Sequence, residues 1–485
     1  LLLASRYQPL ENAGKFAEGI ALEKLDLVLL MGWGLGYEAE AIRKRMGIAN
    51  NLFILEKDVR AFGLSLSRRD YAELLEDERV FLLVAEEKDK IFAFFRDHVK
   101  LFFGGGRVLL AEHPAAVAAA ETHYRAVKEE WDEFLRSGAL LIRTAMILPR
   151  KSFENRILHA SGYLVSPGLE AVANRFAGYP AIIVSAGPSL ARNVEQLAEA
   201  RKQAVVIAVS TSLIPVLERG IRPHYTVVLD FHQISKRYFE RVDPAEARRI
   251  PLVVDAKASY DAVKVYPGPR LFADDAFLDH LFQEIGVKHD TLSAGATVAH
   301  TAFFYACHLG CDPIIFVGQD LSFPYNVTHV PGTATHKSWF PELNRFYTYE
   351  MKEWDQVLRM RSILIRRKDV KGNPVYVDEQ MLSYLKDFTM HFAKSGRRVV
   401  NATEGGALTE GVELLSLSEA RQKYLTREIP EELFTLPGSD PEELRARLAQ
   451  GDRSLASRLE DLDRMGEHYE TSLALLKRIL ARAEQ

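Results

Sequence analysis

The segment from Pro180 to Leu190 constrains the fold of this chain more than any other stretch. The apolar run 181–185 is rich in β-branched residues, which is typical of a strand buried in a parallel sheet. It breaks at Gly187-Pro188-Ser189, and apolar residues at helical spacing follow from Leu190. A strand that turns directly into a helix points free N–H groups and the positive end of the helix dipole at one place. The segment therefore predicts an α/β fold, with either an anion site or an ordinary tight turn here.

The residue types in this turn favour a bound phosphate. Gly187 has no Cβ, so a phosphate can approach the backbone, and the Ser189 hydroxyl is a hydrogen-bond donor. Pro188 fits a first helical turn, where its missing N–H costs nothing. The Gly-Lys-Ser/Thr sequence of a P-loop is absent. The turn is thus predicted to cradle a phosphate without the lysine that grips a triphosphate.

The whole chain shows the same alternation of apolar runs and helical patterns. It predicts an α/β fold with two doubly wound, Rossmann-like domains and a C-terminal helical region. Because 485 residues are too many for one core, the chain is divided into several regions. These are an N-terminal Rossmann-like domain at 1–114, a helical connector at 115–178, a central catalytic α/β domain at 179–417 and a helical domain at 418–485.

Individual elements follow from local patterns. Strands are predicted at 27–31, 52–56, 80–84 and 108–110, and in the central domain at 181–185, 204–209, 225–230, 251–255, 313–318 and 398–401. The sequence Asp440-Pro441 is typical of a helix start. The apolar stripe that follows, from Leu455 to Leu480, favours packing or self-association and leaves an oligomer open.

Composition limits the function classes. A net charge of −4 gives no support for a nucleic-acid or anionic-membrane partner, and the basic run 361–371 is typical of a solvated face. No segment resembles a signal peptide or a membrane span. The two cysteines, Cys307 and Cys311, exclude a disulfide scaffold and favour a reducing, cytoplasmic location. Their spacing around His308 allows a metal site, but packing on a buried helix is favoured.

The N-terminal domain has a glycine turn of its own, at Gly32-Trp33-Gly34-Leu35-Gly36. With Glu56 at the end of the next predicted strand, it resembles a methyltransferase nucleoside site, in which an acid binds ribose hydroxyls. Tyr37 stands where a dinucleotide-binding turn has its third glycine. We favour a structural turn, with ligand binding as the alternative.

Polar residues follow several central strands. Ligands of open α/β sheets bind beyond the carboxyl ends of the strands, so a polar cleft is predicted there. Each residue taken singly is more typical of a turn or cap. A further glycine-containing helix start, Gly295-Ala296-Thr297, predicts either a second anion site or close helix packing. The candidate binding residues are Ala186, Gly187, Pro188, Ser189, Ser210, Thr211, Asp230, Gly295, Ala296, Thr297, Gln319 and Asp320.

A long polar loop after Asp320 carries the candidate catalytic residues. It contains Tyr325 and His329, and His336 lies just beyond. A histidine on a loop at the carboxyl end of a strand suits a general base, although a plain surface histidine is the alternative.

Four blocks of the sequence together resemble the motility accessory factor (Maf) group of flagellin glycosyltransferases, over roughly residues 20–420. The central domain of that group is shared with archaeal hydroxymethyl-dihydropterin diphosphokinases (MptE-like) and is similar in fold to bacterial sialyltransferases. The blocks are 180–190, 295–321, Thr328-His329 and Asn401-Ala402-Thr403-Glu404-Gly405-Gly406.

The resemblance implies transfer of a nonulosonic acid, pseudaminic or legionaminic acid, from its CMP-activated form to Ser/Thr of flagellin. By similarity to the sialyltransferases, Gly187, Pro188 and Ser189 would hold the CMP phosphate. Ser210, Thr211 and Asp230 would line the nucleotide cleft, and 295–297 the sugar or nucleotide side. Where sialyltransferases have asparagines at strand ends, this chain has Ser185 or Ala186, Ser210 and Asp230.

The implied chemistry needs only a base and stabilisation of the leaving phosphate. His329 is the expected base and His336 the second choice, while Tyr325 and the turn at Ser189 would stabilise charge on the leaving group. No cofactor or metal is implied, although Asp230 and Asp320 could host a divalent ion. Two alternatives remain: a pterin diphosphokinase that uses ATP and Mg²⁺, and a non-catalytic flagellin-binding factor.

Overall fold

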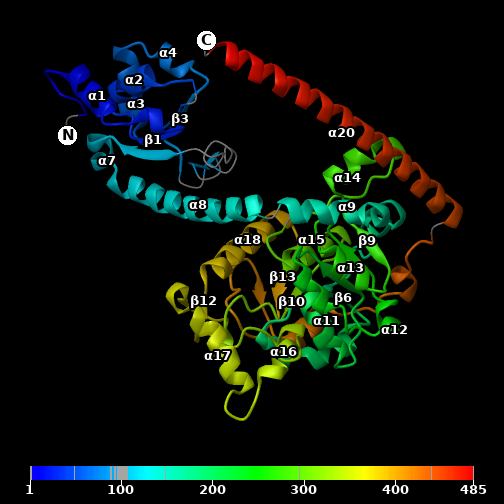
Figure 1. Cartoon of the computed structure of the whole chain (residues 1–485). Helices are drawn as coiled ribbons and strands as arrows, with labels where there is room; N and C mark the ends of the chain where they lie inside the picture. Colours follow the sequence, from blue (N-terminus) through cyan, green and yellow to red (C-terminus); the bar gives the residue numbers. More distant parts are fainter. Residues whose placement is uncertain are drawn as a thin grey trace. The chain divides into compact units, whose positions relative to one another are not determined.

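The computed structural model describes residues 3–48, 50–87, 90–91, 94–95, 107–147, 149–293, 295–438 and 440–483 (Figure 1). The chain forms two compact units, Leu1–Pro149 and Arg150–Gln485. Both contain a parallel sheet with helices, so the predicted α/β class with two doubly wound domains is confirmed. The finer division into four regions stays a prediction.

The N-terminal unit is built on a four-stranded parallel sheet with the order β3-β2-β1-β4. All four predicted strands are present, within two residues of their expected bounds. The strands are β1 (Leu27–Met31), β2 (Asn51–Glu56), β3 (Val80–Val84) and β4 (Val108–Glu112). The helices are α1 (Pro9–Glu18), α2 (Tyr37–Arg45), α3 (Val59–Arg68), α4 (Ala72–Leu75), α7 (Pro114–Ala119) and α8 (Glu121–Ile147).

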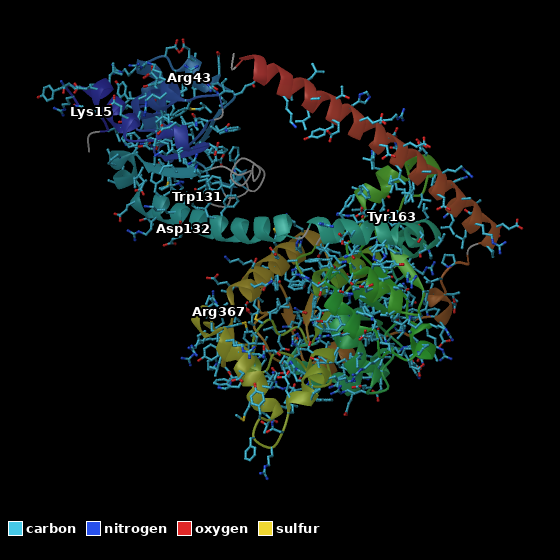
Figure 2. The ribbon with its side chains drawn as sticks, in the orientation of Figure 1. Lys15, Arg43, Trp131, Asp132, Tyr163 and Arg367 are labelled. Carbon is cyan, nitrogen blue, oxygen red and sulfur yellow. The ribbon has the colours of Figure 1, made fainter. Side chains whose placement is uncertain are left out.

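Strand β1 shows why this sheet is covered on both faces. All five of its side chains are buried, and successive side chains point to opposite faces. Val28 and Leu30 belong to a core with Trp33 on one face. Leu29 belongs to the other core, which includes Trp131 of α8 (Figure 2). Burial of each such side chain contributes about 1.5–3 kcal/mol.

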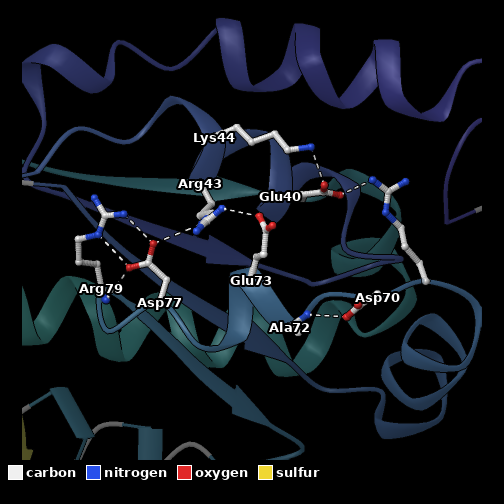
Figure 3. A network of polar contacts seen from close by, with 9 residues as sticks. Glu40, Arg43, Lys44, Asp70, Ala72, Glu73, Asp77 and Arg79 are labelled. Carbon is white, nitrogen blue, oxygen red and sulfur yellow. Dashed lines mark hydrogen bonds and ion pairs between the residues drawn. The ribbon is translucent and has the colours of Figure 1, made fainter.

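A set of ion pairs pins α2 and α4 to the start of β3 (Figure 3). Arg79 Nη2 donates to Asp77 Oδ2 over 2.6 Å, and Arg43 Nε donates to the same oxygen over 3.3 Å. The hydrogen bonds from Arg79 lower the pKa of Asp77. Glu73 pairs with Arg43 over 3.3 Å. The contacts of these charged groups lie within the unit, so we treat the network as structural.

The second unit is built on an eight-stranded parallel sheet with the order β14-β13-β10-β5-β6-β7-β8-β9. The six predicted central strands are all present, and β9 and β14 were not predicted. The strands are β5 (Ala181–Val184), β6 (Val205–Val209), β7 (Tyr225–Val228), β8 (Leu252–Val254), β9 (Arg270–Phe272), β10 (Ile314–Val317), β13 (Val399–Asn401) and β14 (Glu413–Leu414).

Helices cover both faces of this sheet and form two buried cores. Cys307 and Cys311 belong to one of these cores and are free thiols, as the packing interpretation expects. The helices are α9 (Pro149–Val165), α10 (Leu197–Ala200), α11 (Ser210–Leu217), α12 (Pro244–Ala247), α13 (Tyr260–Val265), α14 (Ala276–Leu281), α15 (Val298–His308), α16 (Ala334–Trp339), α17 (Tyr349–Arg359), α18 (Glu379–Ser395), α19 (Leu417–Tyr424) and α20 (Pro441–Ala483).

The basic run 361–371 contains β11 (Ile365–Lys368), which forms an antiparallel hairpin with β12 (Pro374–Val377) beyond the run. Arg366 and Arg367 are exposed, in agreement with the predicted solvated face.

The order of strands creates a switch point between β5 and β10. From β5 the chain builds outward through β6, β7, β8 and β9, and it then returns to pair β10 with the other side of β5. In doubly wound sheets, ligands bind at the carboxyl ends of the strands beside such a point. The turns after β5 and β10 are therefore the first place to look for a site.

The C-terminal helix α20 begins at Pro441 as predicted, with Asp440 Oδ1 accepting the N–H of Glu442 over 2.9 Å. The first part of α20 packs on the rest of the second unit, where Ser454 Oγ donates to the carbonyl of Leu281 over 3.1 Å. The predicted apolar stripe beyond it is exposed, at Leu459, Leu462 and Met465 among others. Self-association through this stripe stays a prediction. Within the described part of the chain, no helix combines the length and apolar character needed to cross a membrane.

Candidate functional site

The fold brings the predicted binding residues to one edge of the central sheet. Because its strands are parallel, the turns after β5, β6, β7 and β10 all lie at the carboxyl edge. Helix α15 leads directly into β10, so the start of α15, with Gly295, Ala296 and Thr297, faces the same edge. The edge therefore collects all of the predicted binding residues.

The turn after β5 is closed by a carboxylate from the turn after β10. Asp320 Oδ2 accepts the N–H of Ser189 over 3.1 Å, and Ser189 Oγ donates to Oδ1 over 2.5 Å. The N–H of Gly187 donates to the carbonyl of Gly318 over 2.8 Å. A Cβ at position 187 would clash with Asp320, which is why glycine is required. Burial raises the pKa of Asp320 to about 6, against the opposing effect of the Ser189 hydrogen bonds.

This geometry corrects the predicted phosphate cradle. The N–H and hydroxyl of Ser189, expected to face a phosphate, are already used by Asp320. The regular helix expected after Leu190 is also wrong, because two 3₁₀ turns and only four residues of α10 follow. Asn193 interrupts the helix, since its Nδ2 donates to the carbonyl of Ala402 over 2.9 Å. Tertiary contacts thus override the helical spacing.

Helix α11 provides the direct strand-to-helix turn instead. It begins at Ser210, immediately after β6, and runs for eight residues. Ser212 Oγ anchors its first turn by donating to the carbonyl of Val184 over 2.6 Å. The first N–H groups of an α-helix have no partner within the helix. Ser210 and Thr211 therefore lie where an anion at this edge would be stabilised.

Two buried hydroxyls at this edge have no hydrogen-bond partner among the described residues. They are Ser185 Oγ, at the end of β5, and Thr333 Oγ1, at the start of α16. The segment before Thr333 lies against the same strand end, because the N–H of Val330 donates to the carbonyl of Ala186 over 2.8 Å. Buried polar groups are rarely left unpaired, and such exceptions mark the positions of ligands or water. These hydroxyls favour a polar ligand at this edge.

His329 is held in one tautomer by its neighbours. Thr328 donates both its N–H and its hydroxyl to Glu353 Oε2, each over 2.9 Å. His329 Nδ1 lies 3.2 Å from the same Thr328 hydroxyl oxygen. Because the only hydroxyl proton goes to Glu353, Nδ1 must donate, and Nε2 keeps its lone pair. Burial, with a contribution from His336, lowers the pKa of His329, so the ring is neutral at pH 7 and can accept a proton.

His336 contacts Glu353, the carboxylate that binds Thr328 beside His329. It is 1% exposed, and its Nε2 lies 2.7 Å from Glu353 Oε1. The Tyr349 hydroxyl donates to the same oxygen over 3.0 Å. Burial alone would raise the pKa of Glu353, but the hydrogen bonds from His336 and Thr328 lower it, so the carboxylate is charged. The role of His336 as an alternative base stays a prediction, but its buried ring beside Glu353 fits a supporting role better.

Tyr325 is placed at the rim of the edge. It is 72% exposed, and its ring lies 5.1 Å from the guanidinium carbon of Arg192. Arg192 Nη1 donates to the carbonyl of Glu404 over 2.8 Å, and the side chain remains exposed. Sequence reasoning missed Arg192 as a cation at this edge. It also missed Glu353, for which the i,i+4 spacing from Tyr349 is the available signal.

The remaining predicted residues act in turns and caps. Asp230 Oδ1 accepts the N–H of His232 over 2.9 Å, and Thr297 Oγ1 accepts the N–H of His300 over 3.3 Å. The N–H of Gln319 donates to Thr403 Oγ1 over 3.1 Å. Gly295 packs tightly on His300, as the close-packing interpretation expects. Within the described ranges, no group of three or more His, Cys, Asp or Glu side chains is arranged to hold a metal ion.

The N-terminal glycine turn is also closed by a carboxylate, as the turn after β5 is closed by Asp320. Glu56 Oε2 accepts the N–H of Trp33 over 2.7 Å and that of Gly34 over 3.2 Å. Glu56 Oε1 accepts the N–H of Asp58 over 2.6 Å. A Cβ on Gly34 would clash with His113. The acid expected to bind a ribose therefore binds its own turn, which favours the structural interpretation.

Comparison with known proteins agrees with this architecture. Residues 155–326 match the family model described as 6-hydroxymethylpterin diphosphokinase MptE-like. The chain has an MptE-like domain. Its fold is similar to that of the MAf glycosyltransferase from Magnetospirillum magneticum AMB-1, with a TM-score of 0.56 and 17% sequence identity. The similarity covers 92% of this chain but 65% of the other, so the chain spans less than two thirds of that protein. No curated protein matches the chain.

The resemblance to Maf and MptE-like proteins predicted from the sequence is thereby confirmed. The MptE-like domain contains the turns after β5, β6 and β7, together with Asp320. His329, His336 and Glu353 lie beyond the matched residues.

Proposed function

We propose that the chain is a glycosyltransferase that moves a nonulosonic acid, pseudaminic or legionaminic acid, from its CMP-activated donor to Ser/Thr of flagellin. The observation that carries the proposal is the neutral His329, whose Nδ1 proton is held by Thr328 and, through it, by Glu353. The residue after His329, Val330, bonds to Ala186 at the end of β5, and Ala186 follows Ser185, whose buried hydroxyl has no partner among the described residues. The likeness in fold to a MAf glycosyltransferase supports the same reaction class.

In the proposed mechanism, His329 Nε2 removes the proton from the acceptor hydroxyl. The hydroxyl oxygen then bonds to the anomeric carbon as the bond to the CMP phosphate breaks, and CMP leaves with the bonding electrons. The imidazolium formed on His329 is stabilised by the Glu353 carboxylate through the Thr328 hydroxyl. No cofactor is needed, because the donor already carries its leaving group.

We place the proposed phosphate at the start of α11 rather than at Ser189, because Asp320 already binds the N–H and the hydroxyl of Ser189. There the N–H groups near Ser210 and Thr211 face the carboxyl edge, with the unpaired Ser185 hydroxyl on the neighbouring strand. Arg192, exposed beside the β5 turn, adds a positive charge. Gly187 and Ser189 then support the site by holding Asp320 in place. Asp230, Gln319 and 295–297 remain candidates for contacts to the nucleotide or the sugar.

Pterin diphosphokinase activity is the second candidate, and the MptE-like domain favours it. That reaction would use ATP and Mg²⁺ at the same edge. His329 and Glu353 lie outside the matched residues, which favours glycosyl transfer, because the segment shared with the diphosphokinase family does not supply this base. A non-catalytic flagellin-binding factor is the third possibility, with the exposed stripe of α20 as its contact surface.

One set of assays separates these functions. The chain is incubated with CMP-activated nonulosonic acid and flagellin, with ATP, Mg²⁺ and hydroxymethyl-dihydropterin, or with flagellin alone. We expect sugar transfer only, reduced about 10²–10⁴-fold in His329→Gln. His280→Gln, which changes an exposed histidine of α14, should retain full activity. Sugar transfer that survives in His329→Gln would exclude His329 as the base, and pterin pyrophosphorylation would support the second candidate.

A further inference from the structure

A small cavity lies beside β9, the outermost strand of the central sheet and four positions from β5 in the strand order. Its volume is about 90 Å³, and α9, α13 and β9 line it. The lining runs along the whole of β9, from Arg270 at the start of the strand to Phe272 at its end. The polar lining includes His159, Tyr260, Lys264 and Arg270, and Phe272 contributes an apolar wall. We refer to it as the Arg270 cavity.

The guanidinium of Arg270 is fixed but incompletely paired. Its Nη2 donates to the carbonyls of Val263 and Tyr266 over 3.2 and 3.3 Å. Its Nε is buried and has no hydrogen-bond partner among the described residues. Burial lowers the pKa of Arg270, and no ion pair joins it to a described carboxylate. A buried donor of this kind costs free energy unless an acceptor occupies the adjacent space.

The other polar groups give the Arg270 cavity a positive charge. The ammonium of Lys264 lies 5.8 Å from the centre of the Tyr260 ring and makes no ion pair with the described residues. Burial lowers the pKa of His159 to about 4, so its ring is neutral, and its Nε2 lies 3.0 Å from the carbonyl of Ala258. No Asp or Glu is among the described residues that line the cavity. Two cations therefore face this space without a compensating anion.

The size of the cavity limits the ligand. A water molecule occupies about 30 Å³ in the liquid, so the cavity has room for about three waters. Sites for drug-sized molecules measure about 300–1,000 Å³, so a nucleotide is excluded. A tetrahedral oxyanion has four acceptor oxygens, enough to satisfy Arg270 Nε and Lys264 together.

We propose that the Arg270 cavity binds a small tetrahedral oxyanion, with inorganic phosphate as the reference ligand. One oxygen accepts from Arg270 Nε and another from the Lys264 ammonium, and the Tyr260 ring forms a wall. This site is separate from the proposed donor site and does not depend on the proposed glycosyltransferase activity.

Isothermal titration calorimetry of the whole chain with sodium phosphate at fixed ionic strength tests the proposal. Arg270→Lys keeps the charge but removes the Nε donor, and Lys264→Met removes the second cation. We expect each change to weaken phosphate binding about tenfold, the effect of losing one charge-assisted hydrogen bond. Lys288→Met, an exposed change outside the cavity lining, should bind as the unmodified chain does. Saturation with CMP should leave the phosphate affinity unchanged.

Three results would overturn the proposal. The first is the absence of phosphate-dependent heat at millimolar concentration. The second is equal affinity in the unmodified chain and Lys264→Met, which would show an adventitious ion only; this variant changes an exposed side chain and so tests the site even where Arg270→Lys fails to fold. The third is loss of phosphate binding on adding CMP, which would assign the phosphate to the donor site.

Discussion

The glycine turn of the N-terminal unit and the turn after β5 in the second unit are both closed by a carboxylate from within the same unit. Glu56 accepts three backbone N–H groups around the first turn. Asp320 accepts the N–H and the hydroxyl of Ser189 at the second. By sequence, both turns resemble sites for a nucleotide. A glycine turn after a strand therefore does not identify a binding site by itself.

The surroundings of the two turns differ. At the N-terminal turn, Trp33 Nε1 donates to Ser65 Oγ over 2.7 Å, and the Tyr71 hydroxyl donates to the carbonyl of Leu35. At the turn after β5, the hydroxyls of Ser185 and Thr333 are buried without partners among the described residues. Two buried atoms without a hydrogen bond also lie beside the N-terminal turn, His113 Nε2 and Glu38 Oε2, but these two face each other over 3.4 Å as an ion pair. The comparison teaches that hydroxyls with neither a hydrogen bond nor an ion-pair partner, more than glycines, distinguish a ligand edge from a packed one.

Alanine at the two turns should produce the largest effects. Gly34 has a φ of +59° and would place a Cβ against His113, so Gly34→Ala should destabilise the N-terminal unit by about 3 kcal/mol. Gly187→Ala should cost about 2 kcal/mol, because its Cβ meets Asp320 and the Gly318 carbonyl at 2.5 Å. Urea unfolding followed by tryptophan fluorescence measures both losses.

The rate of sugar transfer should distinguish the two glycine substitutions more clearly than stability does. Gly34→Ala should keep the sugar-transfer rate per folded molecule, whereas Gly187→Ala should lower it at least about tenfold, because it displaces the strand end that carries Ser185. Equal losses of activity in both variants would contradict the distinction between the turns.

The pH dependence of stability should separate the two carboxylates. The folded pKa of Asp320, about 6, lies above its unfolded value of 3.8, so the folded state binds more protons between these values. Its contribution is therefore fully present below about pH 4 and falls by about 3 kcal/mol as pH rises through 6. Asp320→Asn should remove this slope, and Glu56→Gln should leave it in place. Denaturation at a series of pH values from 3.5 to about 7.5 checks this, and an unchanged slope in Asp320→Asn would contradict it.

Removal of single hydroxyls should give the smallest effects. Ser185→Ala deletes an unpaired hydroxyl, so stability should change by less than about 0.5 kcal/mol while KM for the donor rises about fivefold. Ser65 Oγ accepts from Trp33 and donates to the carbonyl of Phe62 over 2.7 Å. Ser65→Ala should therefore cost about 1–2 kcal/mol and leave KM unchanged. Steady-state kinetics and urea unfolding on both variants give the four values; a KM that rises in Ser65→Ala would count against the account.

Much of the fold could be predicted from the sequence, because buried parallel strands are continuous apolar runs with polar ends. Strands β9 and β14 were missed because each is short and begins with a charged residue, Arg270 or Glu413, which interrupts the apolar run. The helix expected after Leu190 was wrong because Asn193 bonds to Ala402, far away in the chain. Local spacing does not contain that information.

The candidate site was predictable in its location and less so in its chemistry. The strand-end rule located the edge that carries Ser185, Ser210 and His329. The pairing of Ser189 with Asp320, 131 residues apart, depends on β5 and β10 being neighbours, which the sequence pattern does not specify. Glu353 was missed because it lies on a helix that looks solvent-facing by sequence, although it is 1% exposed in the structure.

A crystal structure of the chain with bound CMP tests the central claim most directly. We predict density for the phosphate at the start of α11, within hydrogen-bonding distance of Ser210 or Thr211 and of Ser185 Oγ, with the Asp320–Ser189 bonds intact. CMP bound at the Gly32–Gly36 turn of the N-terminal unit, or at Ser189 with Asp320 displaced, would contradict the account.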